Sequence, residues 1–246
     1  MSEHLNSILK DVLQQAEELD FSVLGNADVQ SEAEKEEAWL MERLGRFTSS
    51  EFHRLMGNED KLEFPKGAIT YSNEKALEVL TEFGGAKKYK GEAMQWGSDT
   101  EKEACIEFMR KYDIEVSRFA EEQEFFKKGE HIGGTPDGII TVNGKIEGGI
   151  ETKCPESKTH LYYLMNVNLS NFKKLLTDYY WQCQGNMYVT GAKYWYFISY
   201  DPRFKDVNHR LFVLKIMRNE SDLLKLRRRL SGAIKMKTEI LTKMKS

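Results

Sequence analysis

GGTPDGIITVNGKIEGGIETKCP, residues 133–155, is the segment from which the architecture of this chain can be worked out. Its first half is rich in β-branched side chains, and Asn143-Gly144 is among the strongest short signals for a hairpin turn. A second β-rich run, residues 145–153, follows the turn. The sequence therefore predicts two antiparallel strands that fold back on each other at Asn143 and Gly144.

The predicted hairpin brings three charged side chains together. Side chains in a strand alternate between its two faces, so Glu151 and Lys153 point the same way and Thr152 points the opposite way. The turn folds Asp137 back toward them. Two carboxylates at close range repel each other unless a cation lies between them, and oxygen ligands favour Mg²⁺ or Mn²⁺ over zinc. The pattern predicts a divalent-cation site formed by Asp137 and Glu151, with the ammonium of Lys153 beside it.

The same residues have a simpler interpretation. Asp-Gly after proline is common in turns, and alternating Glu and Lys is typical of a solvated strand face. Ile139, Ile140 and Ile150 make both strands apolar, which favours a hairpin in the core. Polar groups on such strands need a reason to be there, and this argues for the cation site.

Helices and further strands are predicted on both sides of the hairpin. Helical spacing of apolar residues predicts helices over residues 48–57, 74–85, 97–112, within 170–190, and over 221–244. Residues 58–73 are expected to form a loop. Buried strands are predicted over residues 192–200 and 209–217. This order of elements predicts an α/β fold with a central mixed sheet flanked by helices.

Composition limits the number of domains. The chain has 246 residues, 40% of them apolar, which is enough for one sizeable core and short for two. Residues 1–37 are acidic and weakly periodic, so we expect an N-terminal extension before one domain over residues 38–246. No apolar run is long enough to cross a membrane and the start does not resemble a signal peptide, so the expected location is the cytoplasm. Three scattered cysteines, Cys105, Cys154 and Cys183, are expected to be reduced.

Charge is divided unevenly along the chain. The formal net charge is −3, but residues 123–246 contain 21 Lys and Arg against 12 Asp and Glu, and the first half is strongly acidic. Such asymmetry indicates either a polyanion partner or a surface charged for solubility. The charge pattern alone leaves both interpretations open.

Six segments, taken together, resemble the phage lambda exonuclease family, also described as YqaJ-type viral recombinases, within the PD-(D/E)XK nuclease superfamily. They are AWLMERLGRFTSSEFHRLM, MQWGSDTEKEA, GGTPDGI, IETKCP, WQCQGNMYVT and YWYFISYDPRF, in this order between residues 38 and 204. Their joint order is far more specific than any one of them. The resemblance implies a restriction-endonuclease-like fold.

The resemblance also implies roles for individual residues. Asp137 and Glu151 match the metal-binding acids, the main-chain carbonyl of Thr152 is a further ligand, and Lys153 matches the catalytic lysine. Glu101 matches a helix-borne acid that helps to organise the metal site. Gln182 matches a glutamine that holds the active-site carboxylate or the substrate. Taken alone, Glu101 is typical of an exposed helix surface and Gln182 of a glutamine bonded to solvent.

A second group of residues matches a pocket for the 5′-terminal phosphate of DNA, namely Arg43, Ser50 and Thr135. A guanidinium with two hydroxyls is suitable phosphate chemistry, because arginine presents a fork of charged donors. Taken alone, Arg43 is typical of a surface arginine. Thr135 stands where the family pattern has serine, and Lys127 and Lys128 stand where it has a further acid, so a second metal would be bound differently.

The resemblance implies a Mg²⁺-dependent exonuclease, for which Mn²⁺ substitutes, that degrades one strand of linear double-stranded DNA from its 5′ end. It implies a ring-shaped homotrimer and a role in phage-type recombination, in which the 3′ single strands pass to an annealing protein. Two alternatives remain, a PD-(D/E)XK endonuclease and a catalytically silent module that binds DNA ends.

Overall fold

The structure is a computed structural model in which residues 32–61, 63–84 and 92–245 are described. The chain divides into two units, residues 1–38 and residues 39–246. Of the first unit only residues 32–38 are described, and they belong to helix α2, Glu32–Arg43. Most of the predicted extension, residues 1–37, therefore lies outside the described residues. The following paragraphs concern the second unit.

The larger of two sheets contains the predicted hairpin. Its strands are β4 (Gly138–Val142), β5 (Lys145–Lys153), β6 (Tyr194–Tyr200) and β7 (Leu211–Met217), in that spatial order. Strands β4 and β5 are antiparallel, β5 and β6 are parallel, and β6 and β7 are antiparallel, so the sheet is mixed. Asn143 and Gly144 both have positive φ, 51° and 74°, as a two-residue turn of the primed type requires. The predicted hairpin is confirmed.

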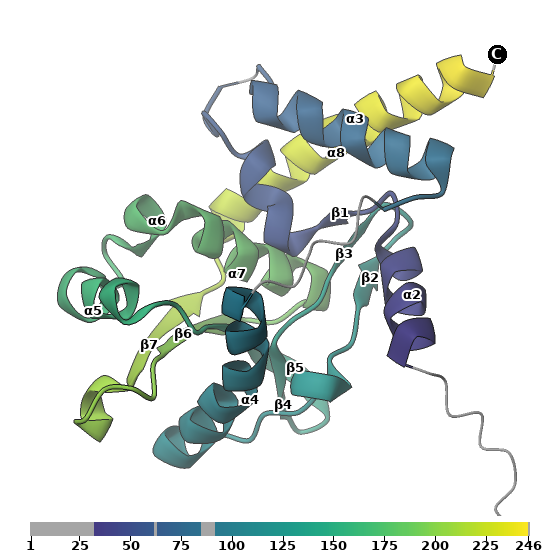
Figure 1. Ribbon diagram of the computed structural model, residues 1–246. Coiled ribbons are helices and arrows are strands. Elements are labelled where there is room, and N and C mark those ends of the chain that lie inside the picture. Colours follow the sequence, from purple (N-terminus) through teal and green to yellow (C-terminus); the bar gives the residue numbers. More distant parts are fainter. Residues whose placement is uncertain (1–31, 62, 85–91, 246) are drawn as a thin grey trace, which may run out of the picture. The chain divides into compact units, whose positions relative to one another are not determined.

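Helices cover both faces of this sheet (Figure 1). Strand β6 turns Phe197 to one face, where it packs with α5 (Ser157–Asn166), α6 (Phe172–Leu175) and α7 (Thr177–Thr190). Ile198 points to the other face and packs with α4 (Glu92–Tyr112). The alternation along one buried strand explains why helices flank the sheet on two sides. The predicted α/β fold with a mixed sheet is confirmed.

A second, smaller sheet was not predicted. It consists of β1 (Phe47–Thr48), β3 (Ile132–Gly134) and β2 (Phe126–Lys128), in that order. Its strands have two or three residues each, too few to show an alternating pattern. A 3-10 helix, η2 (Ser49–Leu55), replaces the α-helix predicted there and packs on α7 at Gly185, where an added Cβ would lie 2.5 Å from the Phe52 ring.

Two helices begin well before their predicted positions. Helix α3, Lys66–Thr81, begins inside the segment predicted as a loop. The segment is polar overall, so its helical periodicity was not recognised, but one face of the helix is buried and consists of Ala68, Tyr71, Ser72 and Ala76. The Ser72 hydroxyl on this face donates to the carbonyl of Ala68 at 2.8 Å. Helix α4 begins five residues before the predicted position. The remaining short elements are the 3-10 helices η3 (Ala120–Glu122) and η4 (Val207–His209).

Helix α8, Glu220–Lys245, lies along α3 (Figure 1) and is held by two buried cations. The Arg229 guanidinium donates to the carbonyls of Asn58 and Lys61, at 2.9 and 3.0 Å. The Lys237 ammonium donates to the carbonyl of Gly45 at 2.8 Å. Buried charges are tolerated because carbonyl oxygens replace their water. These bonds fix α8 against the loops that precede α3 and β1.

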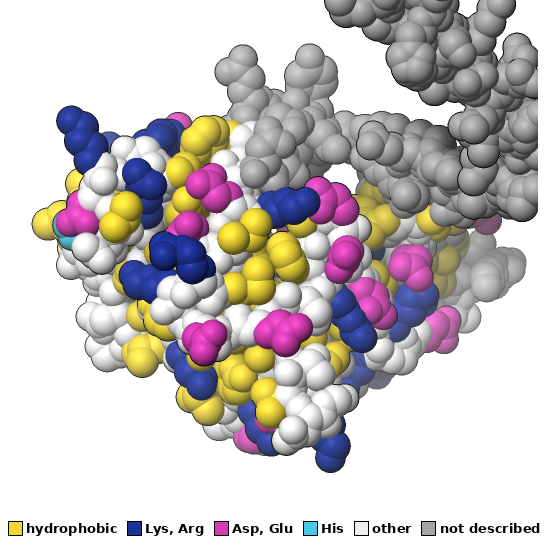
Figure 2. All heavy atoms as spheres, turned by 90° about the horizontal axis from the view of Figure 1, so that it is seen from below, with side chains coloured by type: hydrophobic (Ala, Val, Ile, Leu, Met, Phe, Trp, Pro, Cys, Tyr) yellow, Lys and Arg dark blue, Asp and Glu magenta, His cyan; other side chains and the backbone are white. Residues whose placement is uncertain are grey.

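The surface does not gather positive charge on the face that Figure 2 shows. Over the described residues visible there, Lys and Arg side chains are interspersed with Asp and Glu and with apolar groups. None of the described helices is long and apolar enough to span a membrane. The three cysteines are free, and burial raises the pKa of Cys105 and Cys154 to about 12.

Candidate functional site

The hairpin holds Asp137 against the end of β5. Asp137 immediately precedes β4, and its carboxylate accepts a hydrogen bond from the backbone N–H of Thr152, with Oδ2 2.7 Å from the nitrogen. Gly138 is paired with Ile150 in the sheet, so the register of the hairpin sets this contact. A backbone donor fixes the carboxylate where the turn delivers it.

The ammonium of Lys153 lies among the three predicted oxygen ligands. It contacts Glu151 Oε1, it is 3.0 Å from the carbonyl oxygen of Thr152, and it is 3.9 Å from Asp137 Oδ2. The Thr152 side chain turns to the opposite face of the sheet, where its register partner is Ile198. The structure thus brings Asp137, Glu151 and Lys153 together, with the alternation that the sequence indicated.

Burial dominates the electrostatics of this cluster. The Glu151 side chain is fully buried, and burial followed by the charge of Asp137 raises its pKa. For Lys153, burial opposes the charged form, but Glu151 and Asp137 outweigh it and raise the pKa of the ammonium. Burial, then the charge of Asp137, raises the pKa of Glu101 on α4 to about 7. Glu101 is therefore close enough for the charges of Asp137 and Lys153 to affect its pKa, although it makes no hydrogen bond to the cluster among the described residues.

The donor set suits a small divalent cation. Two carboxylates and one carbonyl converge on a point at which a cationic ammonium already lies. In the described part of the chain, no three His, Cys, Asp or Glu side chains are arranged to hold a metal by themselves. Mg²⁺ is compatible with this set, because it is commonly bound by one or two carboxylates together with waters and substrate phosphates.

Arg43 and Thr135, predicted to form a phosphate pocket, are in direct contact. The guanidinium donates to the Thr135 hydroxyl at 2.8 Å, and its central carbon lies 4.3 Å from the Trp39 ring centre and 5.6 Å from that of Phe125. Ser50 lies two residues after β1, and its hydroxyl is 3.4 Å from the hydroxyl of Thr48. Among the described residues it makes no hydrogen bond to Arg43 or Thr135, so the structure joins two of the three.

Helix α7 contributes a contact that the sequence did not reveal. The Asn186 amide donates to Glu151 Oε2 at 3.3 Å, and both side chains are buried. Gln182, which the resemblance selected, is partly buried and has no hydrogen-bond partner among the described residues. Gln184 faces away and bridges the carbonyl of Met217 and the backbone of Asn219. Asn186 is one helical turn after Gln182 and so shares its face, which was the available signal.

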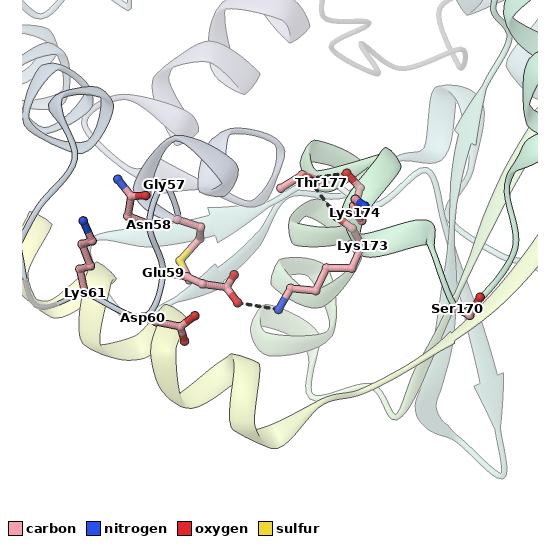
Figure 3. A pocket seen from close by; sticks show the side chains of 10 residues that line it. Gly57, Asn58, Glu59, Asp60, Lys61, Ser170, Lys173, Lys174 and Thr177 are labelled. Carbon is pink, nitrogen blue, oxygen red and sulfur yellow. Dashed lines mark hydrogen bonds and ion pairs between the residues drawn. The ribbon is translucent and has the colours of Figure 1, made fainter.

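A pocket elsewhere has different chemistry (Figure 3). It has a volume of about 670 Å³ and lies between residues 56–61 and residues 170–177. Lys173 reaches across to Glu59 at 2.7 Å and to Asp222 at 3.0 Å. Lys225 pairs with Asp60 at 2.7 Å. Each of these acids is paired with a lysine, and Lys61 and Lys174 also line the pocket, so it lacks the excess of carboxylates found at the hairpin.

Fold and site together indicate a PD-(D/E)XK-type protein, with two acids and a lysine on a hairpin of a mixed α/β sheet. Residues 38–193 match the YqaJ-like viral recombinase domain, and the chain belongs to this family. The predicted resemblance is confirmed. No match was found among curated proteins.

Solved structures share the fold. The alkaline exonuclease LHK-Exo from Laribacter hongkongensis is similar with a TM-score of 0.70 and 23% identity, over 85% of this chain and 96% of that chain. Its complex with dAMP gives a TM-score of 0.69 with the same identity and coverage. A phage related exonuclease from Haemophilus somnus 129PT gives 0.62 at 18% identity, over 81% and 96%. These likenesses confirm the predicted restriction-endonuclease-like fold.

Proposed function

We propose that this protein is a Mg²⁺-dependent exonuclease that degrades one strand of linear double-stranded DNA from its 5′ end. The observation that carries the proposal is the ammonium of Lys153 lying among oxygens of Glu151, Thr152 and Asp137 at the end of a hairpin. Membership of a viral recombinase family supports it. So does the shared fold with proteins named as exonucleases.

Asp137, Glu151 and the carbonyl of Thr152 would hold Mg²⁺, and Mn²⁺ would substitute for it. When bound, the ion polarises a phosphoryl oxygen and lowers the pKa of a bound water. Glu101, whose pKa is raised by burial and then by the charge of Asp137, would help to organise this set from α4.

The other side chains bind and orient the substrate. The Lys153 ammonium stabilises charge that develops on the phosphate and orients the attacking water. Gln182 has an amide without a partner among the described residues, and it is available to the substrate or to a carboxylate. Arg43, Ser50 and Thr135 bind the 5′-terminal phosphate, with Arg43 already directed by its bond to Thr135.

The proposed biological role is phage-type homologous recombination. The 3′ single strands left by the reaction would pass to a single-strand annealing protein in the cytoplasm of the host cell. We further propose a ring-shaped homotrimer around the DNA, as the resemblance implies. The complex of LHK-Exo with dAMP supports a nucleoside monophosphate as the released product here.

The test uses linear duplex DNA with a 5′ phosphate and a label on either strand, incubated with the full chain with and without Mg²⁺. We expect one strand to shorten from its 5′ end, only when Mg²⁺ is present. Glu151→Gln and Lys153→Ala should abolish hydrolysis and retain DNA binding. Lys145→Ala, a matched change at the exposed start of the same strand, should digest DNA as the wild type does.

The outcomes separate the remaining functions. Closed circular DNA should stay intact, and nicking of it would indicate an endonuclease instead. Binding of DNA ends without cleavage under Mg²⁺ or Mn²⁺ would indicate a silent end-binding module. Undiminished digestion by Lys153→Ala would remove that residue from the reaction.

A further inference from the structure

The carboxylate of Glu151 is held at both oxygens by different donors. Lys153 contacts Oε1, and the amide nitrogen of Asn186 donates to Oε2 at 3.3 Å. Glu151 and Asn186 are both fully buried, so no water competes for this contact from bulk solvent. The two donors together fix the plane of the carboxylate.

The orientation of the Asn186 amide follows from its surroundings. Its carbonyl oxygen has no hydrogen-bond partner among the described residues and lies beside β3, where a Cβ added at Gly134 would be 3.0 Å from it. A flipped amide would place that oxygen against Oε2 of Glu151, and two acceptors would repel each other. The N–H therefore faces the carboxylate, at the expense of an unsatisfied oxygen. An unpaired buried acceptor costs free energy, and the bond to Glu151 holds the amide in this orientation despite that cost.

The helix that carries Asn186 is fixed on several sides. Gln184 joins α7 to β7 through the carbonyl of Met217 and to the start of α8 through the N–H of Asn219, at 2.9 and 3.0 Å. Gly185 allows η2 to approach closely, because an added Cβ would be 2.5 Å from the Phe52 ring. The donor at Asn186 is therefore presented from a rigid element.

We propose that Asn186 is a positioning residue that holds the Glu151 carboxylate in the orientation in which it binds the divalent cation. The inference rests on the proposed function, since it gives Glu151 the role of a ligand. Hydrogen bonds to ligating carboxylates orient them, and loss of such a partner typically weakens metal affinity or activity 10- to 100-fold. Asn186 acts through Glu151 and does not touch the reacting atoms.

The test compares Asn186→Leu, which keeps a branched side chain of somewhat larger volume and removes the donor, with Gln184→Leu, which removes a buried amide from the same helix and leaves Glu151 alone. Binding of Mn²⁺ to the full chain is measured by calorimetry, and DNA digestion is measured in parallel. Asn186→Leu should bind Mn²⁺ about tenfold more weakly, with a lower kcat and an unchanged KM for DNA. Gln184→Leu should lower Tm and keep the Mn²⁺ affinity of the wild type.

Each result decides between the claims. If Asn186→Leu binds Mn²⁺ with an affinity within about twofold of the wild type, the positioning role is overturned. The proposed function still stands in that case, provided that the wild type binds Mn²⁺ and digests DNA. Equal weakening by Gln184→Leu would also overturn it, because the effect would then come from the helix. If the wild type itself binds no Mn²⁺, the proposed function fails and the inference fails with it.

Discussion

Replacement of Arg43 by alanine should abolish the preference for 5′-phosphorylated ends. The guanidinium has five N–H donors, and among the described residues it gives a side-chain hydrogen bond only to Thr135, at 2.8 Å. It is stacked on Trp39 at 4.3 Å, which limits its rotamers before a substrate arrives. Burial lowers the pKa of Arg43 and outweighs the opposite effect of Tyr71, Glu51 and Glu78, and Arg43 forms no ion pair among the described residues. The remaining donors are thus oriented and poorly solvated, which strengthens their bonds to an anion.

The magnitude follows from the bonds lost. A hydrogen bond to a charged group contributes about 1.5–3 kcal/mol, and a fork of two bonds to one phosphate should contribute about 3 kcal/mol after the cost of desolvation. This corresponds to a factor on the order of 100 in kcat/KM. Arg43→Ala should lose this factor on duplexes with a 5′ phosphate and change little on duplexes with a 5′ hydroxyl.

The assay measures kcat/KM on two linear duplexes that differ only in the 5′ group. Arg46→Ala is the matched control, since the Arg46 side chain donates to the carbonyls of Glu42 and Gly129 and secures the β2–β3 turn. It should lower stability and preserve the ratio between the two substrates. If Arg43→Ala slows both substrates by the same factor, the reasoning about the pocket is wrong.

Two further predictions concern stability. Gly134→Ala would place a Cβ 2.4 Å from Ser49 Oγ, and overpacking of this kind costs about 1–3 kcal/mol. Tm should therefore fall by several degrees and recover in part when Ser49 is also changed to alanine; an unchanged Tm would show that β3 and η2 move apart easily. Burial lowers the pKa of His160, whose ring bonds Ser199 and the carbonyl of His209. The neutral ring thus contributes stability that is present above about pH 6.5 and is lost as pH falls through the lower folded pKa. Urea titrations at several pH values from 8 to 5 should show the free energy of unfolding falling with pH in the wild type and falling less steeply in His160→Gln. An equal dependence on pH in the two proteins would contradict this prediction.

The hairpin and its charged groups could be predicted because their determinants are local. The turn residues, the alternation and both strands lie within residues 133–155, and Asn143 and Gly144 adopt the positive φ that the turn needs. The proximity of Glu101 and the contact of Arg43 with Thr135 depend on packing between segments far apart in the chain. Only the ordered resemblance of several segments could indicate them.

The smaller sheet and the contact of Asn186 were missed for physical reasons. The strands of the smaller sheet have two or three residues each, and β3 contains two glycines, Gly133 and Gly134. Such short strands show no periodicity and are stabilised by the elements that they join. Along α7 the sequence offers two glutamines and an asparagine within five residues, and which of them meets Glu151 depends on the rotation of the helix. In the structure Gln184 bonds to the carbonyl of Met217 at the end of β7, and it is Asn186 that meets the carboxylate of Glu151. Within residues 180–189 of the helix the only residues that are not buried are Gln182 and Tyr188, so the sequence has no clear polar face and its periodicity is uninformative.

The segment between the two sheets connects the proposed sites. Thr135 bonds to Arg43, Asp137 bonds to the N–H of Thr152, and only Pro136, itself buried, lies between them. Two residues of extended chain span at most about 7 Å, and proline restricts the backbone further. Both ends of this tripeptide are tied to other elements, so the distance between the proposed phosphate pocket and the proposed cation site is short and nearly fixed. A terminal phosphate held by Arg43 would therefore present the nearest phosphodiester, and no distant one, to Asp137 and Glu151, which is the geometry that removal of nucleotides from an end requires.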